Sequence, residues 1–198
     1  MRHLALDVIR DEHQALSAML RSMGLLVAQA HREGHAPDFS VLRAMLFYVD
    51  EFPERLHHPK ESELLFPRVR ERCPALAATL DRLDADHARG EAAIRQLEHA
   101  LLAYEVLGDA RRADFIEALD SYVHGYLAHM AVEESEILPA ATSHLTEADW
   151  AVLDSAFAAN RDPLTGHTAD DVYRPLFSKI VRTAPAPVGL GWFKPAAA

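Results

Sequence analysis

Two stretches of this 198-residue chain pair a histidine with a glutamate in the same way. Glu61 follows His57 by four residues, and Glu133 follows His129 by four residues. In both stretches an apolar run comes next and a proline stands six residues after the glutamate. Residues i and i+4 of an α-helix lie on one face roughly 6 Å apart, so an imidazole and a carboxylate at this spacing can bind one metal ion. One such pair often arises by chance, but a repeated pair indicates a site.

A single histidine in an otherwise apolar helical seam precedes each pair. His13 lies 44 residues before His57, and His87 lies 42 residues before His129. Each half of the chain is therefore predicted to be a helix with one inward histidine, followed by a helix with an inward histidine and glutamate. If the two halves pair in a bundle, four imidazoles and two carboxylates meet at one level of the core.

The simplest alternative is that these residues are structural, because a lone histidine on an apolar helix face is usually a core residue with satisfied hydrogen bonds. Buried glutamates are different, since an unpaired buried carboxylate costs several kcal/mol. Two cations would supply both the charge and the bonds that such a cluster lacks. We therefore predict a metal site formed by His13, His57, Glu61, His87, His129 and Glu133.

The donor atoms limit the choice of metal. Nitrogen and oxygen donors without a thiolate suit iron, manganese or zinc. Six donors are too many for one tetrahedral zinc ion and suit two ions bridged by the carboxylates, with room for water or a small ligand. We favour two iron ions, because such open sites carry out dioxygen and peroxide chemistry, and keep manganese and zinc as alternatives.

Several neighbouring residues have weaker claims. We expect His58 to face outward or to lie behind the ligands, and Glu134 to be solvated. Glu91 follows the histidine of the third helix by four residues, so it is either a further ligand or a hydrogen-bond acceptor for one. Tyr122 and Tyr126 lie on the inward seam of the fourth helix, where they either pack or donate hydrogen bonds near the metals.

Apolar residues recur every three or four positions over most of the first 142 residues, which predicts helices. The expected helices span 4–31, 39–72, 75–107 and 110–141, and no stretch shows the strict alternation of a strand. Two prolines predict a kink in the second segment or a break near residue 52. Short loops between long helices favour an all-α, up-down-up-down four-helix bundle.

We place a domain boundary after this bundle, which gives a four-helix domain at 1–142 and an extension at 143–198. The extension contains two short helical patterns and a tail rich in Pro, Ala and Gly from residue 185. We expect it either to cap the bundle or to form the contact of a homodimer. It contains no recognisable chemical motif.

The composition excludes several kinds of partner. The net charge is −10 with no basic stripe, which argues against a nucleic-acid partner and an anionic membrane surface. Cys73 is the only cysteine, so neither an internal disulfide nor a thiolate-only metal site can form. No apolar run approaches the ~20 residues of a membrane span, and no signal-peptide pattern is present. We predict a cytoplasmic protein.

Four short motifs together resemble the hemerythrin-like HHE cation-binding domain. They are Asp11-Glu12-His13, His57-His58-Pro59-Lys60-Glu61, Asp86-His87-Ala88-Arg89-Gly90-Glu91 and His129-Met130-Ala131-Val132-Glu133-Glu134. The resemblance covers about residues 1–142. It implies a four-helix bundle around a non-haem di-iron centre, with the six predicted residues as ligands and both glutamates as bridges.

The resemblance includes departures that bear on function. Oxygen-carrying hemerythrins use five histidines and have a His-x-x-x-His motif on the third helix, where this chain has Glu91. The donors are closer to those of iron-sensing and iron-centre repair proteins, although the latter carry a cysteine pair that this chain lacks. We predict a di-iron protein that interacts with oxygen, nitric oxide or peroxide in sensing or stress response.

Four alternatives compete with this prediction. A peroxide-consuming di-iron enzyme and an iron donor for damaged iron centres use the same ligands. A ferritin-like oxidase needs Glu-x-x-His on two helices, and only Glu54 and His57 have that spacing. A purely structural bundle is disfavoured by the cost of its buried charges.

Overall fold

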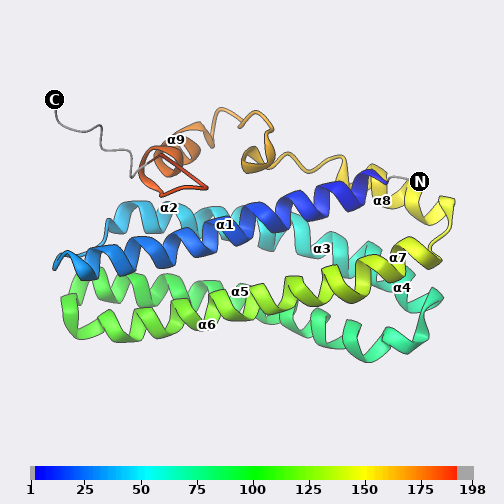
Figure 1. Ribbon diagram of the computed structural model, residues 1–198, viewed down its shortest axis with the longest axis horizontal. Helices are drawn as coiled ribbons and strands as arrows, with labels where there is room; N and C mark the ends of the chain where they lie inside the picture. The colour runs from blue at the N-terminus through cyan, green and yellow to red at the C-terminus, as the bar shows by residue number, and fades with distance from the viewer. Residues whose placement is uncertain (1–2, 191–198) are drawn as a thin grey trace.

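The computed structural model describes residues 3–190, and this part of the chain is helical and contains no strand. The prediction of an all-α fold is confirmed. Successive long helical runs lie side by side and traverse the long axis in turn (Figure 1). The first, third and fourth runs begin with α1 (Leu4–Arg32), α5 (Ala77–Leu107) and α6 (Arg112–Val132), and the second begins with α2 (Phe39–Val49).

Local sequence signals set the ends of these helices. Asp38 caps α2, because its side chain accepts hydrogen bonds from the backbone N–H groups of Ser40 and Val41. Gly108 follows α5 at φ +74°, a backbone conformation that side-chain-bearing residues rarely adopt. Short 3-10 turns join the long runs at η3 (Pro74–Leu76) and η4 (Gly108–Arg111).

The second and fourth runs change helix type along their length. The second run continues from α2 through η1 (Asp50–His57), α3 (His58–Lys60), η2 (Glu61–Leu65) and α4 (Phe66–Arg72). The fourth run continues from α6 through η5 (Glu133–Ile137) into α7 (Leu138–His144). The segments η1, η2 and η5 are π-helical, with a wider turn than the α-helices around them.

Prolines explain where the π-helical segments occur. Each segment ends two residues before a proline, namely Pro59, Pro67 or Pro139. A proline ring crowds the carbonyl four residues earlier and lacks an N–H, and a wider turn relieves that crowding. No break therefore occurs near residue 52; the helix widens instead. Two of the π-helical segments begin at Glu61 and Glu133, so the repeated proline shapes the backbone at both predicted bridging carboxylates.

The apolar core is divided into two clusters by a polar level. Ile9 belongs to one cluster and Leu16 to the other, and His13 lies between them on α1. Leu83 and Ile94 flank the same level on α5. The bundle thus buries apolar side chains on both sides of the histidines, which fixes the height at which the polar groups meet.

After α7 the chain returns along the side of the bundle formed by α1 and α2 (Figure 1). This C-terminal segment contains α8 (Glu147–Phe157), η6 (Pro163–Thr165) and α9 (Arg174–Thr183). A capping box between Thr146 and Asp149 opens α8. The homodimer contact stays a prediction, and the predicted tail lies outside the described residues from residue 191 onward.

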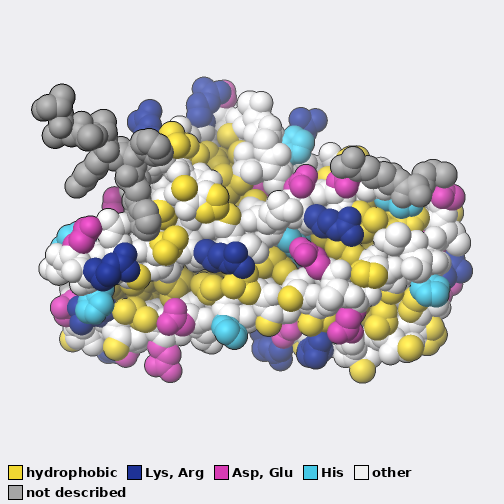
Figure 2. Space-filling model, in the orientation of Figure 1, with side chains coloured by type: hydrophobic (Ala, Val, Ile, Leu, Met, Phe, Trp, Pro, Cys, Tyr) yellow, Lys and Arg dark blue, Asp and Glu magenta, His cyan; other side chains and the backbone are white. Residues whose placement is uncertain are grey.

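Lys and Arg side chains are scattered among Asp and Glu on the face drawn in Figure 2. They form no basic stripe there, in keeping with the net charge of −10. Among residues 3–190, no helix has both the length and the apolar character needed to cross a membrane.

Candidate metal centre

The structure brings all six predicted ligands to the polar level between the two apolar clusters. They are His13 on α1, His57 on η1, Glu61 on η2, His87 on α5, His129 on α6 and Glu133 on η5. Each helical run of the bundle contributes at least one of them. The second and fourth runs contribute two each, as the repeated His-x-x-x-Glu spacing requires.

The first group of donors consists of His13, His57 and Glu61, whose donor atoms all lie within 4.8 Å of one another. His57 Nε2 lies 3.2 Å from Glu61 Oε2, and His13 Nε2 lies 3.9 Å from Glu61 Oε1. His13 Nε2 also lies 3.4 Å from Glu133 Oε2. This spacing is compatible with one metal ion bound by two imidazoles and a carboxylate.

The second group consists of Glu61, His87, His129 and Glu133, again with donor atoms within 4.8 Å of one another. His129 Nε2 lies 3.2 Å from Glu133 Oε1, and His87 Nε2 lies 3.6 Å from Glu61 Oε2. The Nε2 atoms of His87 and His129 are 2.9 Å apart. Glu61 belongs to both groups and Glu133 approaches His13, so both carboxylates lie between two candidate metal positions.

Burial provides an independent test of whether these residues fit a metal. The two carboxylates are only 0% and 1% exposed, for Glu61 and Glu133 respectively. Among the described residues, all four of their oxygens and His57 Nε2 have no hydrogen-bond partner, although the imidazoles lie close. Buried acceptors left in this state cost several kcal/mol, and cations would satisfy them directly. The donor set therefore fits two divalent or trivalent ions.

Residues on the first and second helical runs orient two of the imidazoles from behind. Glu12 Oε2 accepts a hydrogen bond from His57 Nδ1 at 2.7 Å. Ser62 Oγ lies 2.8 Å from His87 Nδ1. An acceptor on Nδ1 leaves the lone pair of Nε2 facing the candidate metal position.

Residues on the third and fourth runs complete the set. Asp86 Oδ2 lies 3.5 Å from His129 Nδ1, and Glu134 Oε1 lies 3.1 Å from His13 Nδ1. The expectation that Glu134 is simply solvated is wrong: its side chain is 47% exposed, yet its carboxylate contacts His13.

Comparison with known proteins agrees with this geometry. The family model described as Hemerythrin HHE cation binding domain matches residues 4–141. The chain belongs to the hemerythrin HHE cation-binding domain family. A search of curated proteins found no match. The family is defined by cation binding, and the two donor groups lie within the matched residues of this HHE domain.

The imidazoles of this HHE domain differ in their affinity for protons. Burial lowers the pKa of His57, but Glu61 and Glu12 outweigh it and raise that pKa well above 6.5. Burial also acts on His129, whose pKa is nevertheless raised, mainly by Glu133. The pKa of His87 is lowered to about 2, first by burial and then by neighbouring imidazoles. His87 is thus a neutral donor, whereas a metal at His57 must displace a proton.

A second buried polar cluster lies beside the metal ligands. His58 does not face outward: it stacks on His87 with ring centroids 4.3 Å apart and places Nδ1 3.3 Å from Glu54 Oε2. Glu54 also accepts hydrogen bonds from the hydroxyls of Tyr122, at 3.0 Å, and Tyr126. The tyrosines therefore do more than pack. The side chain of Glu54 is 4% exposed, and the sequence pattern pointed to this acid only as part of a Glu-x-x-His pair, not as a hydrogen-bond partner of His58 and the tyrosines.

Glu91 does not take part in the site. Its side chain is exposed and forms an ion pair with Arg95 on the same helix. Neither role considered for it, ligand or hydrogen-bond acceptor for a ligand, matches its position. Glu91 lies about one turn beyond His87 on α5, but its side chain is on the solvent-exposed side of that helix.

The two donor groups differ in their access to solvent. A groove of about 660 Å³ runs between α5 and α6, and His87, His129, Tyr122 and Tyr126 are among its lining residues. The first group instead borders a cavity of about 10 Å³, enclosed in part by residues of the C-terminal segment. Such a volume holds at most about one water molecule. The groove therefore gives a small molecule a wider approach to His87 and His129 than the cavity gives to the first group.

Proposed function

We propose that this protein holds a non-haem di-iron centre and uses it to interact with oxygen, nitric oxide or peroxide in sensing or stress response. The supporting observation is the pair of donor groups that share Glu61, with both bridging carboxylates buried and lacking hydrogen-bond partners in the described chain. Nitrogen and oxygen donors without thiolates favour iron, with manganese or zinc as alternatives. A bound iron pair would supply the redox chemistry.

The chain's own residues suit an exogenous ligand. The groove between α5 and α6 leads to His87 and His129, so a small molecule can approach that metal position. Hydrogen bonds behind His13, His57 and His87, and the carboxylate of Asp86 at 3.5 Å from His129 Nδ1, hold the rings in place while the ligand exchanges. The burial of both carboxylates excludes water from the opposite side, which protects the centre from solvent.

A peroxide-consuming enzyme is the second candidate. The observation that favours it is the cluster of Glu54, His58, Tyr122 and Tyr126, in which the His58 ring stacks on His87 and connects it through Glu54 to two tyrosine hydroxyls. Donation of iron to damaged centres is less well supported, since both bridging carboxylates are buried and one side of the site is closed.

Metal analysis and ligand titration test the proposal. Purified protein loaded with iron should contain about two irons per chain and show absorption in the near ultraviolet from a bridged ferric pair. Nitric oxide or azide added to the loaded protein should change that spectrum. Loss of peroxide over many turnovers would select the enzyme, whereas ligand binding without turnover would select the sensor. Wild-type protein that retains no metal would overturn the proposal.

A further inference from the structure

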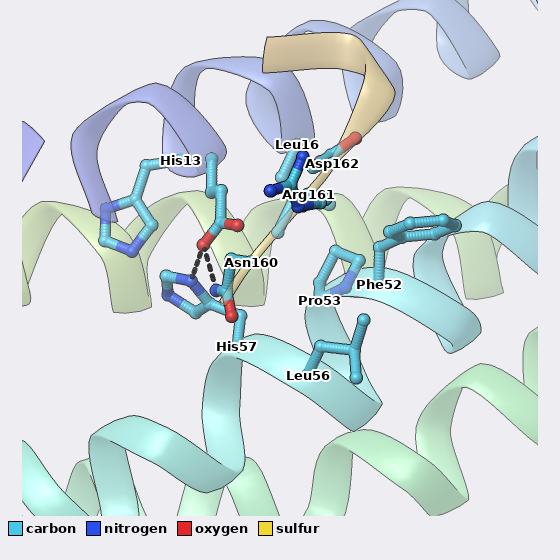
Figure 3. A pocket seen from close by; sticks show the side chains of 10 residues that line it. His13, Leu16, Phe52, Pro53, Leu56, His57, Asn160, Arg161 and Asp162 are labelled. Carbon is cyan, nitrogen blue, oxygen red and sulfur yellow. Dashed lines mark hydrogen bonds and ion pairs between the residues drawn. The ribbon is translucent and has the colours of Figure 1, made fainter. Parts of the chain in front are cut away.

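A residue outside the matched domain reaches the metal centre. Asn160 follows α8 in the C-terminal segment, beyond residues 4–141, and is only 4% exposed. Its Nδ2 donates a hydrogen bond to Glu12 Oε2 at 2.9 Å, and its Oδ1 accepts one from Lys60 Nζ. Figure 3 shows Asn160 beside His57, and its dashed lines mark the hydrogen bonds of Glu12 to these two residues.

The contacts form a chain that ends at a metal ligand. Lys60 donates to Asn160, Asn160 donates to Glu12, and the same carboxylate oxygen accepts from His57 Nδ1. With Nδ1 protonated and held by Glu12, the free lone pair of His57 is on Nε2, 3.2 Å from Glu61. Asn160 thus fixes the position of the group that orients His57.

The segment that carries Asn160 is held on both sides. Before it, Asp154 Oδ1 accepts a hydrogen bond from the backbone N–H of Ala5 at 2.8 Å. After it, Asp162 Oδ2 accepts one from the Tyr48 hydroxyl at 2.5 Å. The side chain of Asn160 is therefore presented to Glu12 by an anchored turn.

The other three imidazoles are oriented differently. Their Nδ1 atoms lie against Glu134, Ser62 and Asp86, all of which belong to the bundle itself. None of these three contacts a residue of the C-terminal segment through a hydrogen bond that the described residues form. Dependence on the segment is thus specific to His57.

We propose that Asn160 is a positioning residue for the metal ion bound by His13, His57 and Glu61. The C-terminal segment is then part of the metal centre, and it secures one of the two ions more than the other. This inference rests on the proposed two-metal centre and adds an asymmetry that the repeated motif does not contain.

The test measures release of iron from the loaded full-length protein to an excess of a strong chelator. Asn160→Leu removes both hydrogen bonds at similar volume, and Asn160→Asp keeps the acceptor for Lys60 but opposes Glu12 with a second carboxylate. Both variants should release one of the two ions about 10- to 100-fold faster than wild type, the range found for residues that orient metal ligands. The second ion should leave at the wild-type rate.

Tyr173→Phe is the control, because it removes a hydrogen bond from the C-terminal segment to Glu51 without touching Glu12, Asn160 or the anchors of its turn. It should lower the melting temperature while leaving both release rates unchanged. Equal release of both ions in wild type and in both Asn160 variants would overturn the role of Asn160, as would acceleration of both ions to the same extent. Failure of wild type to hold two irons would instead overturn the centre itself, so the two failures are distinguishable.

Discussion

The two halves of the metal centre carry the same motif in different surroundings. His13 and His57 border a cavity of about 10 Å³ closed by the C-terminal segment, whereas His87 and His129 line a groove of about 660 Å³. The ligands repeat because the helical spacing repeats. The surroundings do not repeat, because within residues 3–190 the chain that follows the bundle covers the half of His13 and His57 and not the groove. A duplicated motif can thus produce one closed and one accessible metal position.

The contacts behind the imidazoles show the same mixture of symmetry and asymmetry. Each orienting residue is the sequence neighbour of a candidate ligand on its own helical run, but it contacts the histidine of the next run. The first run contacts the second, the second the third, the third the fourth, and the fourth the first. In this order Glu12, Ser62, Asp86 and Glu134 serve His57, His87, His129 and His13. The ring closes around the bundle, and only its contact at Glu12 is reinforced from outside by Asn160.

The largest expected effect concerns the part that both halves share. Glu133→Ala should abolish retention of both ions, because its oxygens lie near His13 in one group and near His129 in the other. Metal content per chain after desalting measures this. Glu134→Ala is the matched control next in sequence; since Glu134 contacts the Nδ1 atom of His13 and is not one of the six donors, its loss should weaken metal binding about 10- to 100-fold without abolishing it. A metal content of Glu133→Ala equal to that of wild type would contradict the role of Glu133 as a bridging ligand.

The closed half should show a pH-dependent stability that depends on Asp162. Burial, reinforced by Glu12, raises the pKa of this carboxyl from 3.8 to about 6, although hydrogen bonds from Tyr48 and Leu164 and the charge of His167 oppose the rise. Because the folded-state pKa is raised, the stabilising contribution is complete below pH 3.8 and is lost as pH rises through about 6.

Asp162→Asn removes this titration. Between about pH 4 and about pH 7, wild type should lose about 2 kcal/mol of unfolding free energy relative to the variant. Urea denaturation of both proteins, each freed of metal by a chelator, measures the difference. A difference that stays constant with pH would show that Asp162 does not titrate in this window.

Close packing at Gly90, beside the accessible half, predicts that a substitution there lowers the stability by less than the titration of Asp162 does. Three residues after the lone histidine, the first half has Leu16 and the second has Gly90. A Cβ at Gly90 would lie 2.6 Å from Glu54 Oε2 and 2.6 Å from the Tyr126 hydroxyl. Gly90→Ala should therefore destabilise the protein by about 1–2 kcal/mol despite the better helix propensity of alanine, as thermal unfolding can measure. Increased stability would mean that the side chains of Glu54 and Tyr126 move away from the added methyl group at little cost in free energy.

The smallest expected effect is kinetic and tests the accessible half. Gly125 lines the groove, and no atom lies within 4 Å of a Cβ built there. Gly125→Leu should fill part of the groove and slow the binding of azide or nitric oxide to the loaded protein several-fold, with metal content unchanged. Gly24→Leu on α1 is the matched control, a helical glycine that is also open at Cβ but is not among the groove's lining residues. Equal rates in all three proteins would place the approach of the ligand elsewhere.

Much of the fold follows from the helical periodicity. Apolar side chains every three or four residues determine four inward faces, and the predicted helix limits agree to within a few residues with α1, α5 and the fourth run from the start of α6 to the end of α7. The second run was harder to predict, because a proline in a helical pattern is compatible with a break, a kink or a wider turn. Packing of the flanking helices decides among these, and here the wider turn occurs.

The sequence by itself determined which six residues point inward, because the spacing of His57 and Glu61, or of His129 and Glu133, fixes their common face. It did not determine which residue contacts the Nδ1 atom of each histidine. Those contacts join different helices, and their distances do not follow from the periodicity of one helix. Only the tertiary structure carried Glu91 out to Arg95 and brought Asn160 to Glu12, 148 residues away. The candidate metal ligands are determined by helix faces, while the closed and accessible sides arise from how the chain packs around them.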